Sequence, residues 1–219
     1  MPTKPVKLKV SPAIGEVSAE YFIPKDATYI MTLAHGAGAG MNHSFMVALT
    51  EALGMEGVAT LRFNFPFVEQ KKKRPDFPAV AHKTIEVAIN HAKESFPGLP
   101  LFTSGKSFGG RMSSQFLAIH PGSGVKGIIF FGFPLHPAGK PSTERADHLK
   151  ELEMPLLFLQ GTRDTLAEIN LIESLCSSLP KATLIKLDGA DHSFKAGKQN
   201  LVPILAGHTK KWMDSILSA

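Results

Sequence analysis

The stretch "LFTSGKSFGGRMSSQFLA" (residues 101–118) joins an apolar run to a helix-forming one and holds Ser107 at the junction. Gly105 and Gly109 stand two residues before and two residues after this serine. A serine flanked by glycines can be an ordinary tight turn. It can also be held in a sharp strand-to-helix corner, where neighbours two positions away must lack a Cβ to avoid a clash. The rest of the chain has to distinguish the two interpretations.

Short apolar runs alternate with stretches of helical period along the chain. The predicted strands cover residues 6–10, 20–24, 28–36, 58–65, 99–105, 125–133, 155–161 and 182–189, and the predicted helices cover residues 44–53, 78–95, 108–119, 169–179 and 201–217. Apolar strands that alternate with helices form parallel sheets covered on both faces. We therefore expect an α/β fold with a doubly wound, mostly parallel sheet and helices on both faces, built as a single domain over residues 1–219.

Composition and charge narrow the class of protein. Hydrophobic residues make up 43% of the chain and charged residues 20%, which favours a soluble globular protein over a disordered one. The net charge of +5 is mildly basic, and the one dense basic cluster, residues 71–74, falls in a predicted loop, so we expect no nucleic-acid partner. The chain shows neither a signal-peptide pattern nor an apolar run long enough to cross a bilayer. With Cys176 as its single cysteine, it is predicted to be cytoplasmic, without a disulfide or a membrane partner.

Three polar residues follow three different predicted strands. Ser107 follows the strand at 99–105, Asp164 is the first carboxylate after the strand at 155–161, and His192 follows the strand at 182–189. Loops after the strands of a parallel sheet gather at one edge, where ligands bind. The segment Gly105–Gly109 also matches G-x-S-x-G, and the order Ser, Asp, His is the one typical of a serine nucleophile in this kind of sheet.

These residues predict a catalytic triad. Ser107 would be the nucleophile, His192 the general base, and Asp164 the carboxylate that accepts the Nδ1–H of the histidine. Asp164 is also a good helix N-cap, which is the alternative for this residue. Asp191 is adjacent to His192 in sequence and is therefore poorly placed to orient its ring. His91 and His208 lie on apolar helix faces and are interpreted as core residues.

A glycine-rich turn, "HGAGAG" (residues 35–40), follows the predicted strand at 28–36. A tetrahedral intermediate needs two N–H donors aimed at its oxyanion. Phe108, directly after the serine, would supply one donor, and Ala37 the other, with Gly38 as the alternative. The spacing of the glycines does not match G-x-G-x-x-G, which argues against a dinucleotide phosphate loop.

The strings "GKSFGGRM", "GFPLHPAGKP" and "LFLQGTRD" resemble the α/β-hydrolase superfamily, and within it a compact, dienelactone-hydrolase-like subgroup. Eukaryotic relatives in that subgroup include a testis-expressed protein and a subunit of a histone-acetyltransferase regulatory complex. The resemblance implies Ser107 as nucleophile, Asp164 as acid and His192 as base, and it names no substrate. Dienelactone hydrolases carry a cysteine nucleophile where this chain has Ser107, and Cys176 lies on an apolar helix stripe that predicts a buried position.

Substrate contacts are expected from four residues beside the elbow and the turns: His35, Gly38, Lys106 and His136. The segment at residues 133–144, where many such hydrolases carry a lid, is short, so we expect little or no lid and a shallow site for small esters. Basic residues near this edge could steer an anionic substrate, or they could form an ordinary solvated face. Arg111 opposes the dipole of its helix, which predicts a carboxylate partner.

The sequence thus predicts a serine hydrolase that cleaves a small ester or thioester through an acyl-enzyme. The alternative is a hydrolase-shaped scaffold or interaction module with little turnover, and a third option is a C–C or amide hydrolase that uses the same residues. No H-E-x-x-H motif and no Cys/His cluster with zinc spacing occurs, so no metal or cofactor is expected. The sequence does not indicate an oligomeric state.

Overall fold

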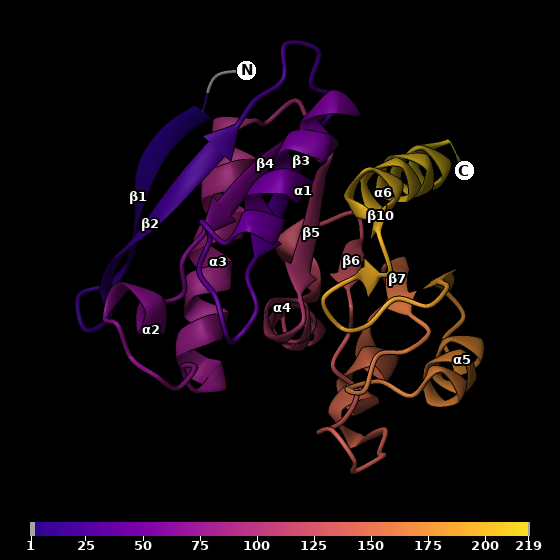
Figure 1. The fold of residues 1–219 in the computed structure, drawn as a ribbon. Coiled ribbons are helices and arrows are strands. Elements are labelled where there is room, and N and C mark those ends of the chain that lie inside the picture. The colour runs from indigo at the N-terminus through magenta and orange to yellow at the C-terminus, as the bar shows by residue number, and fades with distance from the viewer. Residues whose placement is uncertain (1–2, 219) are drawn as a thin grey trace.

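Eight strands form one sheet in the order β1-β2-β4-β3-β5-β6-β7-β8 in the computed structural model, which describes residues 3–218 (Figure 1). The strands are β1 (Thr3–Ser11), β2 (Gly15–Phe22), β3 (Tyr29–Ala34), β4 (Val58–Phe63), β5 (Leu101–Lys106), β6 (Ile128–Phe131), β7 (Leu156–Gly161) and β8 (Ala182–Leu187). β2 pairs antiparallel with β1 and with β4, and the pairings from β4 to β8 are parallel. This confirms the predicted mostly parallel sheet.

Helices cover both faces of the sheet. One face carries α1 (Ser44–Met55) and α6 (Val202–Leu217), and the other carries α3 (Pro78–Ser95), α4 (Phe108–Ala118) and α5 (Ile169–Ser178) (Figure 1). Every residue of β3, β4 and β7 is buried, because each of these strands packs against helices on both sides.

The apolar strands divide their side chains between two cores. Phe130 of β6 joins the cluster under α3, α4 and α5, whereas its neighbour Phe131 joins the cluster under α1 and α6. Successive residues of a strand point to opposite faces, so a run of apolar residues fills both cores. Cys176 is buried in the first core, as predicted, and burial raises the pKa of its thiol to about 12.

Several short elements were not predicted from the sequence. They are the helix α2 (Pro66–Glu69), the 3-10 segments η1 (Pro121–Ser123) and η2 (Glu144–Glu151), and the two-stranded ribbon of β9 (Lys195–Ala196) and β10 (Gln199–Asn200). Elements of this length carry too few periodic positions to leave a pattern in the sequence. Within residues 3–218 no helix combines the length and apolarity needed to span a membrane.

Replacing Phe130 with alanine tests the packing of the larger core. The ring is fully buried and lies 4.6 Å from the ring of Phe158 and 5.2 Å from that of Phe133, measured between centroids. We expect Phe130→Ala to lower the free energy of unfolding by about 3–5 kcal/mol in urea titrations, since the substitution leaves a cavity. Met55→Ala, at an exposed position, is the control and should change it by less than about 0.5 kcal/mol. Equal losses in the two variants would contradict this assignment of the core.

Candidate active site

Ser107 lies at the sharp turn between β5 and α4, with φ 50° and ψ −115°. A positive φ is uncommon for a residue other than glycine, and here the close approach of the helix to the sheet maintains it. A Cβ on Gly105 would lie 2.2 Å from the nitrogen of Gly110, and one on Gly109 would lie 2.5 Å from the carbonyl oxygen of Ala34. Only glycine therefore fits on either side of the serine, as the sequence pattern predicts.

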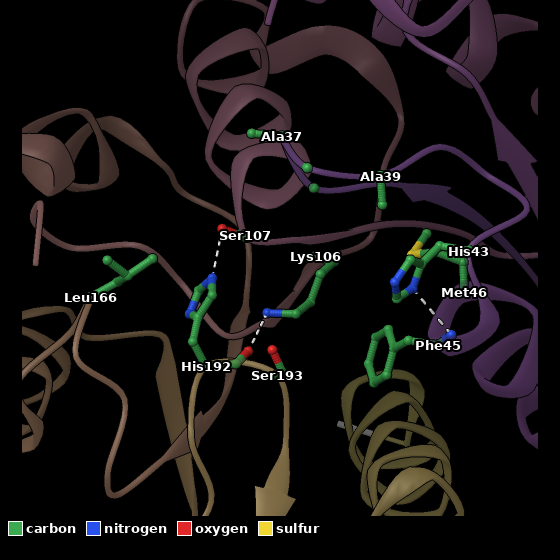
Figure 2. Close-up of a pocket in the computed structure, with 12 residues that line it drawn as sticks. Ala37, Ala39, His43, Phe45, Met46, Lys106, Ser107, Leu166, His192 and Ser193 are labelled. Carbon is green, nitrogen blue, oxygen red and sulfur yellow. Dashed lines mark hydrogen bonds between the residues drawn. The ribbon is translucent and has the colours of Figure 1, made fainter. Parts of the chain in front are cut away.

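The turn brings Ser107 to the same edge of the sheet as His192 and Asp164. The Oγ of Ser107 is 2.8 Å from Nε2 of His192, and Nδ1 of His192 is 2.7 Å from Oδ2 of Asp164 (Figure 2 shows the first contact). The three residues follow β5, β8 and β7, respectively. They form a continuous chain of hydrogen bonds although they lie far apart in the sequence.

Asp164 is held in one orientation by several donors. Its side chain is fully buried, and besides His192 it accepts hydrogen bonds from Nε2 of Gln160 (2.6 Å) and from the backbone N–H of Leu166 (2.8 Å). It does not cap a helix, because the N-cap residue of α5 is Glu168. Asp191 accepts from the N–H groups of its own turn and makes no hydrogen bond to His192. Asp164, and not Asp191, therefore bonds the ring of His192, and Asp164 does not serve as a helix cap.

Gln160 is a site residue that the sequence analysis missed. It is buried in β7, its Oε1 accepts from the N–H of Phe133 (2.9 Å), and its Nε2 donates to Asp164. It therefore joins the loop after β6 to the carboxylate after β7. The available signal was a lone polar residue in the otherwise apolar strand "LLFLQG", because a buried amide needs partners.

The glycine-rich turn after β3 packs against the serine. A Cβ on Gly36 would lie 3.7 Å from the Cβ of Ser107, and Ala37 and Gly38 line the same cavity as Ser107. Within residues 3–218, the backbone N–H groups of Ala37 and Phe108 donate no hydrogen bond to the protein. Ala37 lines the cavity beside Ser107 and Phe108 follows Ser107 directly in the chain, so the oxyanion role of their N–H groups stays a prediction.

The cavity beside Ser107 has a volume of about 380 Å³. Its walls are largely apolar, and Figure 2 shows Lys106, His192 and Leu166 around the serine, with Phe45 and Met46 from α1 farther out. No residue from 133–144 lines the cavity, so this segment does not cover it. The space suits a small ligand with mostly apolar surface.

Lys106 connects the elbow to the loop that carries His192. Its ammonium donates to the backbone carbonyl of His192 (2.5 Å, Figure 2) and lies 5.2 Å from the centroid of the Phe194 ring. Burial lowers the pKa of Lys106 to about 8, an effect that the nearby carboxylates of Asp164 and Asp191 partly oppose. The side chain lines the cavity and also bonds the backbone of His192, and its predicted contact with substrate stays a prediction.

Two predicted substrate contacts are corrected by the structure. His35 is fully buried, accepts from the N–H of Phe65 through Nε2 (3.0 Å) and bonds the carbonyl of Gly36 through Nδ1 (2.8 Å). His136 is also fully buried and accepts from the N–H of Glu168 through Nε2 (3.0 Å). Neither lines the cavity, because both imidazoles satisfy backbone groups that join neighbouring loops. Burial also lowers the pKa of His35 to about 4, which keeps the ring neutral.

Arg111 lacks the carboxylate partner that its position predicts. Within residues 3–218 it forms no salt bridge, and its buried Nε has no acceptor. Burial and the charge of nearby Arg145 lower the pKa of Arg111. Helix α4 contacts η2, and Arg145, not an acidic residue of that segment, is the charge that acts on Arg111.

A metal site was not expected from the sequence. The described residues contain no cluster of three or more His, Cys, Asp or Glu side chains suited to a metal ion.

The mostly parallel sheet, with Ser107, His192 and Asp164 in contact at one edge, can now be compared with known protein families. Residues 27–213 match the family described as the alpha/beta hydrolase domain, and the chain belongs to that family.

Solved structures share the fold over nearly the whole chain. Est1E from Butyrivibrio proteoclasticus is 16% identical, with a TM-score of 0.76, and the match covers 98% of this chain and 99% of that one. A dienelactone hydrolase from Anabaena variabilis is 20% identical, with a TM-score of 0.78 and coverage of 98% and 97%. A protein from Xanthomonas campestris, described as an α/β serine hydrolase without a lid, is 19% identical, with a TM-score of 0.75 and coverage of 97% and 96%.

Two glycine-to-alanine substitutions, at Gly109 and at Gly38, test how closely α4 packs against the sheet at the turn that holds Ser107. In Gly109→Ala the new Cβ would overlap the backbone of β3, whereas in Gly38→Ala it would meet no atom within 4 Å. We expect Gly109→Ala to lower the free energy of unfolding by about 1–3 kcal/mol or more, because α4 must move away from the sheet. Gly38→Ala should stay within about 1 kcal/mol of the wild type. Urea titration measures both, and a Gly109→Ala protein as stable as Gly38→Ala would refute the close contact.

The lowered pKa of Lys106 predicts a pH dependence of stability. Between about pH 8 and the ordinary lysine value of about 10.4, the unfolded chain binds more protons at this residue than the folded protein does. The free energy of unfolding should therefore gain a positive contribution as pH rises above about 8. Lys106→Met should remove that contribution, so urea titrations at about pH 7.5 and 9.5 should show a smaller rise in this variant than in the wild type. Lys25→Met, at an exposed position, controls for the loss of one lysine. An identical rise in wild type and Lys106→Met would exclude this effect.

Proposed function

We propose that the protein is a serine hydrolase that cleaves a small ester or thioester through an acyl-enzyme. The observation that carries the proposal is the chain of contacts from Ser107 Oγ to His192 Nε2 (2.8 Å) and from His192 Nδ1 to Asp164 Oδ2 (2.7 Å). Membership of the alpha/beta hydrolase domain family agrees with it. In this proposal Ser107 is the nucleophile, His192 the general base and Asp164 the residue that orients the imidazole.

The first half of the reaction forms the acyl-enzyme. Ser107 Oγ attacks the carbonyl carbon while His192 Nε2 accepts the hydroxyl proton. The tetrahedral intermediate places its oxyanion at the N–H groups of Ala37 and Phe108, and losing one such donor typically costs about 2.7–4 kcal/mol in barrier height. His192 then gives the proton to the leaving alkoxide or thiolate as the bond from carbon to that group breaks.

The second half releases the acid. A water molecule gives a proton to His192 and attacks the acyl carbon, and the Ser107 ester bond breaks as the proton returns to the serine oxygen. Throughout, Asp164 accepts the Nδ1–H of His192 and stabilises the imidazolium. Because Gln160 and the N–H of Leu166 occupy the other acceptor positions of Asp164, the carboxylate is already oriented toward the ring before substrate binds.

The size and cover of the cavity support a small substrate. Its volume is about 380 Å³, and no residue from 133–144 lines it. The structure of Est1E has been determined with ferulic acid, and the Anabaena protein is called a dienelactone hydrolase, so similar folds hold small aromatic acids or act on lactones. We propose a small-molecule ester or thioester as substrate. We also propose that the chain belongs to the dienelactone-hydrolase-like subgroup, together with the testis-expressed protein and the acetyltransferase-complex subunit. We also propose one domain over residues 1–219 and a cytoplasmic location.

Labelling with a fluorophosphonate tests the proposal. This probe reacts covalently with an activated serine, so we expect it to label the wild type and to leave Ser107→Ala unlabelled. Ser95→Ala removes an exposed serine at the end of α3 and should be labelled like the wild type. A panel of p-nitrophenyl esters should show turnover by the wild type and Ser95→Ala, with a loss on the order of 10³-fold or more in Ser107→Ala. An unlabelled wild type without turnover would favour the scaffold alternative.

A further inference from the structure

Three neighbouring hollows lie near Ser107, and the middle one shares lining residues with each of the other two. The active-site cavity and a second cavity of about 340 Å³ both include Ala37, Gly38 and Ala39 in their linings. The far side of the second cavity is formed by α2 and the loop after it, including Lys71, Lys72 and Lys73. The glycine-rich turn therefore separates Ser107 on one side from three lysines on the other.

A third hollow continues from the second. It has a volume of about 700 Å³, shares Lys72 and Lys73 with the second cavity, and is completed by Arg74, Phe77 and their neighbours up to the first turn of α3. Through these shared residues the hollows adjoin one another, from Ser107 over the glycine-rich turn and the lysines to Phe77, and we call this series of hollows the path. Only an extended ligand would contact all three hollows.

The outer part of this path is strongly positive. The side chains at residues 71–74 are three lysines and one arginine, all exposed, and within residues 3–218 they form no salt bridge. One carboxylate, Asp76, lines the third hollow, but its Oδ2 accepts a hydrogen bond from the N–H of Phe67 (2.9 Å). The charge of Asp76 also acts on Lys72, so four cations and one carboxylate leave this loop with an excess of positive charge.

The loop presents its lysines from an ordered turn. Lys71 has φ 53°, its N–H donates to the carbonyl of Val68 (3.0 Å), and the N–H of Lys72 donates to the carbonyl of Phe67 (2.7 Å). This pattern closes the C-terminus of a helix and usually has glycine at the left-handed position. Lysine there costs about 1–2 kcal/mol in backbone conformation. The charge at residue 71 is thus presented at the expense of local stability.

An aromatic ring stands at the far end of the path. Phe77 is 84% exposed at the start of α3, and it lines the third hollow together with Arg74. An exposed aromatic ring and a guanidinium are the groups on which nucleic-acid bases stack. The path therefore offers, in order, a reactive serine, a cluster of ammonium groups and a stacking surface.

We propose that this path binds a thioester whose leaving group is a phosphorylated nucleotide derivative, with its phosphates at Lys71, Lys72 and Lys73 and its base on Phe77. The inference rests on the proposed function, since the acyl carbon must reach Ser107. Four adjacent cations match a ligand with several negative charges better than one carboxylate, and phosphates supply those charges in a small volume. In the reaction the Ser107 oxygen bonds the acyl carbon, the carbon–sulfur bond breaks, and His192 protonates the leaving thiolate.

Binding without turnover tests the site. We expect coenzyme A to bind Ser107→Ala in calorimetric titrations, and pantetheine, which lacks the phosphates and the base, to bind at least about tenfold more weakly. Adding Lys71→Gly, Lys72→Gln and Lys73→Gln should weaken coenzyme A binding at least about tenfold and reduce its salt dependence. The control combines Lys25→Gln, Lys126→Gln and Lys211→Gln, three exposed lysines that line none of the three hollows, and should bind like the parent.

Two single variants separate charge and stacking from folding. Lys71→Gly removes an ammonium at a position whose φ favours glycine, so it should weaken binding while the free energy of unfolding stays equal or rises. Phe77→Ala should weaken ADP binding at least about fivefold, and Phe77→Trp should restore it, because a ring that stacks is replaceable by another ring. Equal binding of coenzyme A and pantetheine, or equal binding by the triple variant and its control, would overturn the proposal.

Three further measurements distinguish a nucleotide site from a membrane-contacting surface, and failure of this site from failure of the proposed function. If phosphatidylserine vesicles bind the wild type but not the triple lysine variant, and coenzyme A binds neither, the basic path is a membrane-contacting surface and the proposal is overturned. If the wild type cleaves p-nitrophenyl esters but prefers an N-acetylcysteamine thioester to the matching coenzyme A thioester, this site fails and the proposed function stands. If coenzyme A binds Ser107→Ala but the wild type resists fluorophosphonate, the serine hydrolase proposal fails and the nucleotide site stands without its reaction.

Discussion

The close contact between the first turn of α4 and the ends of β3 and β5 is the constraint on which the ligand edge depends. At Gly105 and Gly109 a single methyl group would lie within 2.5 Å of backbone atoms. Because these two positions carry no Cβ, the helix can start directly at the end of the strand, and Ser107 is forced to a positive φ at the corner. Its hydroxyl then projects from the sheet instead of packing in it.

Buried polar groups hold the surrounding loops to that corner. His35 joins the turn after β3 to the backbone after β4, and His136 joins the loop after β6 to the one after β7. Gln160 adds a third link, to Asp164, and Lys106 holds the carbonyl of His192. Each of these groups is costly to bury without a partner, so their hydrogen bonds select one arrangement of the loops. The geometry between Ser107 and His192 is thus maintained by residues that do not touch the serine oxygen.

Predictions from the sequence were accurate for features that depend on residues close together along the chain. The buried strands, the long helices and the turn at Ser107 all follow from apolar runs, helical period and glycine spacing, and the structure contains them. Predictions about His35, His136 and Arg111 were wrong because position after a strand, or in a first helical turn, does not reveal which backbone groups and charges come from other segments. The contact that distinguishes Asp164 from Asp191 likewise depends on where β7 and β8 end in space.

The sequence alone determined the parallel sheet, its two apolar cores and the corner that presents Ser107, because these depend on side-chain periodicity and on the absence of a Cβ at Gly105 and Gly109. The tertiary structure alone decided which polar groups meet. Whether a histidine faces a cavity or a backbone N–H, and whether the lysines at residues 71–73 adjoin the glycine-rich turn, depends on loops packed from distant parts of the chain. Hydrogen bonds act over about 3 Å, a distance that only the folded chain can define between residues far apart in sequence.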